Sequence, residues 1–146
     1  MSSNEFLKLE NQLCFSLYAS SRAITRMYRP FLEELGITYP QYLVLLVLWD
    51  QQESTVKELS DKLDLDSGTL TPMLKRMEAQ QLIKRQRSTE DERVVIIRIT
   101  ETGLALYEKA LCIPQSLLAS SGLSPEEIYN FNEQLKRIIS SVNASN

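Results

Sequence analysis

The chain has no histidine and only two cysteines, Cys14 and Cys112, among its 146 residues. The missing histidine excludes catalysis by Ser-His-Asp or Cys-His groups, His-ligated zinc and pH sensing by imidazole. Two cysteines are too few for a structural zinc site or for a disulfide framework, so no metal or other cofactor is expected. So few cysteines are typical of a compartment that keeps thiols reduced, and we expect a cytoplasmic protein.

Long apolar runs are also lacking. No run reaches about 18 apolar residues, and the first ten residues show no basic segment followed by an apolar one. We therefore expect neither a membrane partner nor a secretory signal. With 43% hydrophobic and 24% charged residues, the composition is that of an ordinary globular protein. A chain of this length typically forms one domain and often completes its core by dimerising.

The net charge of −3 does not by itself indicate nucleic-acid binding, but the basic side chains are concentrated in the middle of the chain. The segment from Lys75 to Arg98 holds seven basic and four acidic side chains, a net charge of +3. Residues 54–100 carry +1 and the remainder carries −4. A basic middle between acidic ends is typical of a nucleic-acid-binding surface, although an ordinary solvated surface has the same pattern.

Apolar spacing predicts a long first helix with one face running from Phe6 to Leu35, kinked or restarted at Pro30 and ended by Gly36. The run Thr38-Tyr39-Pro40-Gln41 predicts the capped start of a buried second helix. A capping box at 55–58 predicts a short third helix. A turn follows, and Asp66 or Ser67 caps a fourth helix that carries apolar residues as far as Leu82.

After Leu82 the apolar period changes to two. Residues 83–88 and 93–99, joined by a polar turn, predict a β-hairpin. Thr100 is predicted to cap a further helix that includes Cys112, and residues 124–127 are predicted to start the last one. The predicted fold class is mainly helical with a small β-hairpin. We expect residues 37–100 to form a winged helix-turn-helix, and residues 1–36 plus 101–146 to form a helical dimerisation region.

The second helix of a helix-turn-helix lies in the major groove of DNA, with its N-terminal residues nearest the bases. Side chains on this helix that can contact phosphates or bases are Ser67, Thr69, Thr71, Lys75 and Arg76. Arg93 at the hairpin tip is predicted to enter a minor groove, and Asp91 to hold it from the same side of an extended chain. A capped surface helix and an exposed ion pair worth ~0–1 kcal/mol are the structural alternatives.

Cys14 lies inside an apolar helical face, where most cysteines are small core residues. A reactive cysteine needs a stabilised thiolate, and no lysine or arginine lies close to Cys14 in sequence. Phenolic hydroxyls can donate hydrogen bonds to a thiolate and lower its pKa. Tyr18, one helical turn away, and Tyr28 and Tyr39, beside the next junction, are the candidate donors.

Several segments together resemble the MarR family of winged-helix regulators, and most closely its organic-hydroperoxide-responsive (OhrR-type) branch. The resemblance spans about Leu9 to Leu135. The most specific segments are L-x-N-Q-L-C-F at 9–15 and D-S-G-T-L-T-P-x-L-K-R at 66–76; the remaining ones are residues 17–18, 37–42 and the Asp-x-Arg wing at 91–93.

The resemblance implies a homodimeric repressor whose reduced form binds a pseudo-palindromic operator in double-stranded DNA. Cys14 matches the peroxidatic cysteine, which an organic hydroperoxide oxidises to sulfenic acid. Tyr28 and Tyr39 match tyrosines that contact this cysteine across the dimer, and Tyr18 matches a third. Cys112 lies about two turns before the position of the branch's resolving cysteine, which aligns near Ala119. Cys112 is therefore either a resolving cysteine or a core residue. If it is a core residue, the Cys14 sulfenate is either trapped by a small cellular thiol or over-oxidised.

Three other functions are compatible with parts of this pattern. A MarR-type repressor released by a small aromatic ligand, or by another oxidant such as hypochlorite or a quinone, would keep the same DNA-binding region. A thiol peroxidase is disfavoured because Cys14 lacks a charged or histidine activator, so we expect no enzyme. A dimeric adaptor with a degenerate DNA-binding region is disfavoured by Lys75, Arg76 and Arg93.

Overall fold

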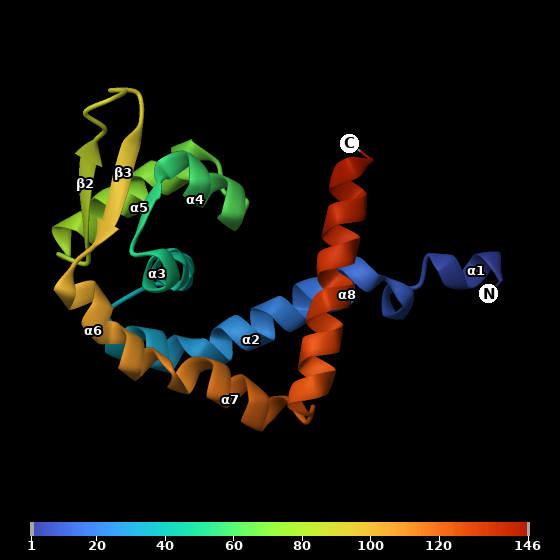
Figure 1. Ribbon diagram of the computed structural model, residues 1–146. Helices are drawn as coiled ribbons and strands as arrows, with labels where there is room; N and C mark the ends of the chain where they lie inside the picture. The colour runs from blue at the N-terminus through green and yellow to red at the C-terminus, as the bar shows by residue number, and fades with distance from the viewer. Residues whose placement is uncertain (1, 146) are drawn as a thin grey trace. The chain divides into compact units, whose positions relative to one another are not determined.

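The computed structural model describes residues 2–145, and the chain divides into two compact units after Leu111 (Figure 1). Each unit is mainly helical, and the first adds a small sheet, which confirms the predicted winged-helix fold class. The elements of the first unit are α1 (Ser3–Phe6), a 3-10 turn η1 (Leu9–Asn11), α2 (Leu13–Leu35), α3 (Tyr39–Gln51), β1 (Glu53–Thr55), α4 (Val56–Leu63), α5 (Ser67–Ala79), β2 (Ile83–Arg87), β3 (Val95–Ile99) and α6 (Glu101–Ala110). Those of the second are α7 (Cys112–Ser121) and α8 (Pro125–Ala144).

The long N-terminal helix begins at Leu13 rather than at Phe6, so the sequence-based start was wrong. The side-chain Nε2 of Gln12 donates to the backbone carbonyls of Phe6 and Lys8, at 2.6 and 2.8 Å. Those carbonyls would accept from the next turn of a continuing helix. Because a side-chain amide satisfies them instead, the chain turns before α2 begins.

α2 then runs as one helix to Leu35, with Pro30 inside it rather than at a break. Gly36 ends the helix at φ 71°, a left-handed conformation that glycine adopts without strain. Thr38 caps α3 through the predicted reciprocal bonds with Gln41. The N–H of Gln41 donates to Thr38 Oγ1 at 3.3 Å, and the N–H of Thr38 donates to Gln41 Oε1 at 3.1 Å.

The core of the first unit is built around α3, which contacts α2 on one side and α4 on the other (Figure 1). Val44, Leu45 and Leu48 of α3 are fully buried, as its apolar sequence predicts. Each such side chain contributes about 1.5–3 kcal/mol relative to exposure. Fully buried side chains of other elements that complete this core are Leu59, Leu70, Leu74, Met77, Ile83 and Ile97. Among residues 2–145, no helix on its own has the length and apolar composition of a membrane span; α2 and α3 pass that test only as a bent pair.

An aromatic row runs along α3 and ends on α6. It consists of Tyr28, Tyr39, Tyr42, Trp49 and Tyr107, with neighbouring ring centroids 5.7–6.2 Å apart. The indole N–H of Trp49 donates to the carbonyl of Gly103 in α6, at 2.9 Å. The row therefore joins the end of α2, the whole of α3 and α6 through ring contacts and one directed hydrogen bond.

The sheet has three antiparallel strands in the order β1-β3-β2, and its β2–β3 hairpin projects beyond the helices (Figure 1). The hairpin agrees with the sequence-based prediction, with Ile83 opposite Ile99 and Arg87 opposite Val95. β1 was not predicted. Its three residues pair with residues 96–98 of β3, which makes β3 the central strand.

The segment after the sheet contains one more helix than the sequence predicts. Thr100 caps α6 as expected, accepting from the N–H of Gly103 at 3.1 Å. This helix ends at Ala110, and Cys112 begins α7 instead of continuing α6. Pro114 has no N–H to donate to the carbonyl of Ala110, which explains why the helix ends there. α8 begins at the predicted capping box of residues 124–127.

Candidate nucleic-acid interface and thiol site

The helix predicted to enter the major groove is α5, called here the reading helix. Asp66 is its N-cap, since its Oδ1 accepts from the N–H of Thr69 at 2.7 Å. Ser67 is therefore the first residue of the helix, with its exposed side chain not used in capping. Of the two caps that the sequence left open, the structure selects Asp66.

The five predicted side chains of the reading helix fall into two rows. Ser67, Thr71 and Lys75 are four residues apart and share one flank. Thr69 and Arg76, seven residues apart, lie on the other flank. The face between the two flanks that points inward carries the buried residues Leu70, Leu74 and Met77. The helix thus exposes two polar rows rather than a single one.

A groove of about 480 Å³ lies between α4, the reading helix and the hairpin. Ser67, Thr71 and Arg93, from distant parts of the sequence, line it together. Lys57 and Arg85 line it too, and sequence reasoning did not single them out as site residues. The groove unites one row of the reading helix with the hairpin and with the first turn of α4.

Lys57 carries a signal in the sequence that was missed. It lies in the first turn of α4, where the helix dipole disfavours a cation. Among the described residues it forms no salt bridge. The expected capping box at this helix is only half formed, because Glu58 Oε2 accepts from the hydroxyl of Ser54 at 3.2 Å while Thr55 accepts from the N–H of Glu58. The helix dipole therefore does not explain this lysine, and its place in the groove makes it a candidate for phosphate contact.

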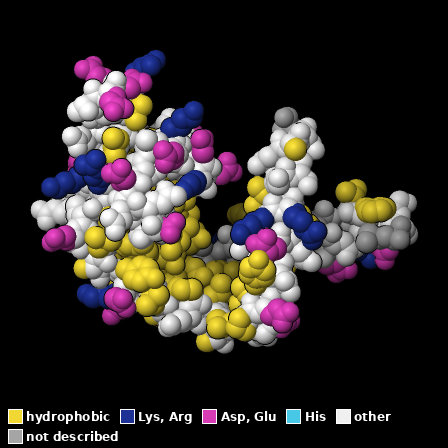
Figure 2. All heavy atoms as spheres, viewed as in Figure 1, with side chains coloured by type: hydrophobic (Ala, Val, Ile, Leu, Met, Phe, Trp, Pro, Cys, Tyr) yellow, Lys and Arg dark blue, Asp and Glu magenta, His cyan; other side chains and the backbone are white. Residues whose placement is uncertain are grey.

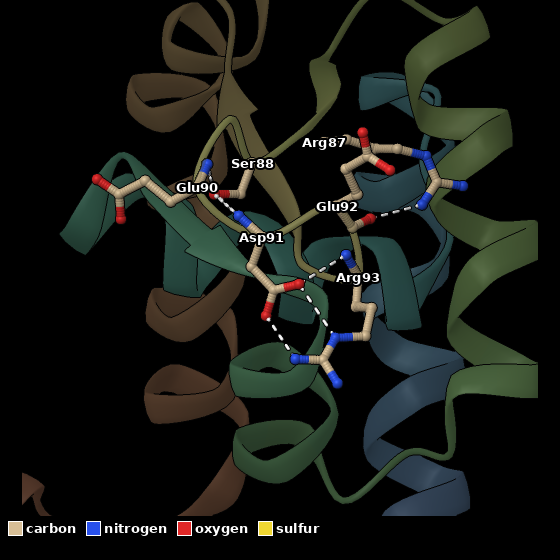
Figure 3. Close-up of polar contacts among 6 residues, drawn as sticks. All are labelled: Arg87, Ser88, Glu90, Asp91, Glu92 and Arg93. Atoms are coloured by element: carbon tan, nitrogen blue, oxygen red, sulfur yellow. Dashed lines mark hydrogen bonds and ion pairs between the residues drawn. The ribbon is translucent and has the colours of Figure 1, made fainter.

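The hairpin tip, called here the wing tip (residues 88–94), holds Arg93 through Asp91 (Figure 3). Asp91 Oδ1 accepts from the backbone N–H and from Nε of Arg93, at 3.0 and 3.1 Å, and Oδ2 accepts from Nη2 at 3.2 Å. These bonds from the side chain and backbone of Arg93 lower the pKa of Asp91. The pair forms across a tight turn, with the N–H of Val94 donating to the carbonyl of Asp91 at 2.9 Å, and not along an extended chain as expected.

The remaining charges of this unit are partly neutralised within the chain. Arg85 donates through its backbone N–H and its guanidinium to Glu78, and these bonds lower the pKa of that carboxyl group. The side chain of Arg93 is 91% exposed despite its carboxylate partner. Over α4, α5 and the hairpin, lysine and arginine side chains lie among aspartates and glutamates and do not form one continuous patch (Figure 2). The cations that line the groove therefore differ from the other basic side chains of this unit in where they lie, and the total charge does not identify them.

Cys14 lies exposed in the first turn of α2, between Leu13 and Phe15, which are also exposed. It is not a core residue of this chain. One turn further, Tyr18 is 60% exposed, and the guanidinium of Arg22 stacks over its ring at 5.4 Å. Arg22 was missed, although its spacing of four residues from Tyr18 on one helix predicts the contact.

Tyr28 and Tyr39 meet where α2 and α3 join, with ring centroids 6.2 Å apart and an interplanar angle of 35°. Burial raises the pKa of both phenols, and the neighbouring Tyr39 raises that of Tyr28 further. Tyr28 follows Cys14 by fourteen residues in the same helix, which separates them by about 21 Å along the axis. The structure therefore brings the two phenols together but keeps them away from the thiol of their own chain.

Cys112, the second cysteine, is half-exposed at the start of α7. It belongs to the second unit, and Cys14 belongs to the first. Within residues 2–145, no group of three or more His, Cys, Asp or Glu side chains could hold a metal ion.

Comparisons with known proteins give a consistent result. Residues 26–110 match the family described as Transcriptional regulator SarA/Rot. The chain is 53% identical, over 142 residues and 97% of both chains, to the Organic hydroperoxide resistance transcriptional regulator of Bacillus subtilis (strain 168).

Two solved structures of AbfR, a protein of Staphylococcus epidermidis, are also similar. Reduced AbfR bound to DNA matches with a TM-score of 0.84 and 38% identity, over 97% of this chain and 99% of that one. Disulfide-formed AbfR matches with a TM-score of 0.64 and 40% identity, over 93% and 96%. From its fold and these relatives, the chain belongs to the MarR/SarA-type winged-helix transcriptional regulators.

Proposed function

We propose that this chain is a homodimeric repressor that binds a pseudo-palindromic operator when reduced and leaves it when an organic hydroperoxide oxidises Cys14. The observation that carries the proposal is the separation of an exposed thiol from two of its candidate phenol donors, Tyr28 and Tyr39. Cys14 lies about 21 Å from Tyr28 along one helix, so only a second copy of the chain can bring Tyr28 and its neighbour Tyr39 to the thiol. The site is then completed by dimerisation.

Exposed apolar side chains around Cys14 support the dimer. Those at the N-terminal end of the chain are Phe6, Leu7, Leu9, Leu13 and Phe15, with Leu7 90% exposed. In the second unit, α8 exposes another set, namely Tyr129, Phe131, Ile138, Ile139 and Val142. Contiguous exposed apolar surface on a single chain is typical of an interface. Both sets lie in the segments predicted for dimerisation, 1–36 and 101–146.

The phenols suit a thiolate because they keep their protons. Their raised pKa values leave Tyr28 and Tyr39 as neutral O–H donors at physiological pH, and donated hydrogen bonds favour the thiolate over the thiol. The thiolate sulfur attacks the terminal oxygen of the hydroperoxide, and the O–O bond breaks. Cys14 becomes a sulfenic acid, a two-electron oxidation. The alkoxide that leaves takes up the proton released when the thiol ionised, and the peroxide is thereby reduced to an alcohol.

The DNA-binding part of the proposal rests on the groove between the reading helix and the wing tip. In a dimer, two reading helices must match half-sites ~34 Å apart, so a small change of their relative orientation costs much affinity. Arg93, exposed at the wing tip, is expected to enter the minor groove beside each half-site. The relative AbfR has been solved bound to DNA in its reduced and in its overoxidized form, which supports DNA binding by a chain of this fold.

The sulfenic acid is expected to react with a second thiol, forming a disulfide and releasing water. Cys112 or a small cellular thiol supplies the second sulfur. Mass spectrometry of the oxidised protein separates the two: an internal disulfide lowers the mass of a Cys112-containing chain by two hydrogens, whereas a mixed disulfide adds the mass of the small thiol. In Cys112→Ser the internal disulfide cannot form, and the sulfenic acid is either trapped by the small thiol or over-oxidised.

The function is tested by fluorescence anisotropy with a labelled duplex selected by the reduced protein from a random-sequence pool. Binding is measured before and after one equivalent of cumene hydroperoxide, for the native chain, Cys14→Ser and Cys112→Ser. We expect the native chain and Cys112→Ser to lose affinity on oxidation and Cys14→Ser to retain it. Equal loss by Cys14→Ser would overturn the assignment of Cys14.

Tight binding that ignores the hydroperoxide would favour the alternative inducers. A small aromatic ligand would release Cys14→Ser as well as the native chain. Hypochlorite or a quinone would release only proteins that retain the thiol. Sustained consumption of peroxide in the presence of a reductant would instead indicate a thiol peroxidase.

A further inference from the structure

The turn between α2 and α3 is bonded to the far end of the reading helix by two glutamine side chains. Gln41 Nε2 donates to Gln80 Oε1 at 3.3 Å, and Gln80 Nε2 donates to the carbonyl of Gly36 at 2.9 Å. Gln80 is the C-cap of α5, and Gly36 is the C-cap of α2. The C-terminal end of the reading helix is thus held at two points, to the C-cap of α2 and to the first turn of α3, which begins at Tyr39.

The direction of each of these hydrogen bonds is determined by the next. Gln41 Oε1 accepts from the N–H of Thr38 at 3.1 Å, which leaves its Nε2 as the donor to Gln80. Gln80 accepts that bond with Oε1 and therefore turns its Nε2 to Gly36. A flipped Gln80 amide would place its oxygen against the carbonyl of Gly36. Gln41 is 5% exposed, so water does not readily replace its bond to Gln80.

Tyr39 is the first residue of α3, two residues before Gln41, and its ring contacts Tyr28. A displacement of Tyr39 moves the first turn of α3 and Gln41 with it. The reading helix has 13 residues, so Gln80 lies about 20 Å from Ser67 at its other end. A shift at Gln80 therefore tilts the end of the helix that faces DNA.

We propose that Gln41 and Gln80 are positioning residues that pass displacements of the Tyr28–Tyr39 pair to the reading helix. The inference rests on the proposed function, in which the two phenols donate hydrogen bonds to the Cys14 thiolate. It explains how a change at these phenols affects the helix that contacts DNA. It adds a continuous chain of directed bonds between the turn beside the phenols and the end of the reading helix, along which coupling between separated sites can be carried.

A double-mutant cycle tests the link in the reduced protein, without any oxidation step. Tyr39→Leu disturbs the turn, and Gln80→Met removes both amide bonds while keeping the length of an exposed side chain. Gln51→Ala, an exposed glutamine of the same helix α3, is the matched control. The Kd for the selected duplex is measured by anisotropy for each single variant and for each combination with Tyr39→Leu.

We expect Tyr39→Leu to raise the Kd about three- to tenfold in the native and Gln51→Ala backgrounds. This is the range expected when displacement of the turn costs one hydrogen bond of the Gln41–Gln80 link. In the Gln80→Met background the same change is expected to raise the Kd less than about twofold. Equal effects in all three backgrounds, or no effect of Tyr39→Leu anywhere, would overturn the inference. A general loss of structure would instead make the two changes additive.

Gln41→Glu provides a second test that spares the helix cap. A glutamate at this position still accepts from the N–H of Thr38 but no longer donates to Gln80, and a flipped Gln80 loses its bond to Gly36. We expect the Tyr39→Leu effect to shrink as in Gln80→Met. Hydroperoxide treatment of the same proteins is read separately: a native chain that ignores it contradicts the proposed function, while the reduced-state cycle still decides the link.

Discussion

Asp91 determines where the guanidinium of Arg93 lies, because three hydrogen bonds join one carboxylate to one arginine across a tight turn (Figure 3). The pair is exposed, so its value for folding is small. Its value for DNA binding lies in orientation, since a side chain that is already aimed loses less conformational freedom when it enters a groove.

Arg93→Ala is expected to weaken operator binding by about 1–3 kcal/mol if the side chain enters the minor groove. Asp91→Ala should weaken it less, because the cation stays and only its orientation is lost. Anisotropy titrations at one salt concentration measure both. Arg98→Ala, which removes another exposed, ion-paired arginine of the same sheet, is the control. An Arg93→Ala affinity equal to that of the control would remove the wing tip from DNA binding.

The buried phenols predict a dependence on alkaline pH. The pKa values of Tyr28 and Tyr39 are raised above the ordinary value of 10.0, mainly by burial. The folded state therefore holds these protons more tightly than the unfolded state does. The stability they contribute is fully present below pH 10 and is lost as the pH rises through the raised values. The measurement is the difference in phenolate absorbance between the native chain and Tyr28→Phe as the pH rises. The midpoint of this difference curve is expected above pH 10, and a midpoint at or below pH 10 would contradict the prediction.

At the scale of elements, α6 approaches the end of the sheet closely at Gly103. A Cβ added to Gly103 would lie 2.5 Å from the carbonyl oxygen of Leu82 and 2.7 Å from Cγ1 of Ile99. The carbonyl belongs to the backbone and cannot rotate away. Gly103 is therefore a packing requirement rather than a conformational one.

Gly103→Ala is expected to destabilise the fold by about 1–3 kcal/mol or more, because the backbone must move to admit one methyl group. Urea unfolding should show a lower midpoint with an unchanged slope. Thr102→Ala, at the exposed neighbouring position of α6, should leave the midpoint within experimental error. A Gly103→Ala midpoint equal to the native one would mean that α6 and the sheet can separate without cost.

Local signals were sufficient for the elements whose starts are capped by side chains. Thr38, Thr100 and Ser124 cap helices where the sequence predicts them, since a cap needs only residues three apart. β1 was missed because three residues without alternation carry no period, and only pairing with β3 makes them a strand. The site was less accessible: Asp91 and Arg93 are near in sequence, but Lys57 joins the groove only through tertiary packing.

At the scale of the whole molecule, the net charge of −3 and the function proposed for the groove are compatible because DNA contacts depend on local charge. Arg85, Arg93 and Arg98 have carboxylate partners within the chain. Phosphate neutralisation is therefore expected to come mainly from cations outside these pairs, such as Lys57 and Lys75.

Operator affinity should fall steeply with salt, since each phosphate contact releases counterions. Lys57→Gln is expected to reduce the slope of log K against log salt by about one. Lys62→Gln, at the other end of α4 and also exposed, should leave the slope unchanged. Equal slopes for the two variants would mean that Lys57 lines the groove without meeting a phosphate.

Trp49 is the single tryptophan of the chain, and it stands where the aromatic row meets α6. Its indole N–H is bonded to Gly103, and the rings of Tyr42 and Tyr107 lie 6.2 and 5.7 Å away. Its emission wavelength depends on that bond and on nearby water. Excitation energy absorbed by the two tyrosines is transferred to the indole ring. The chain thus has a built-in fluorophore at the α3–α6 contact, and unlabelled protein reports optically on any rearrangement there.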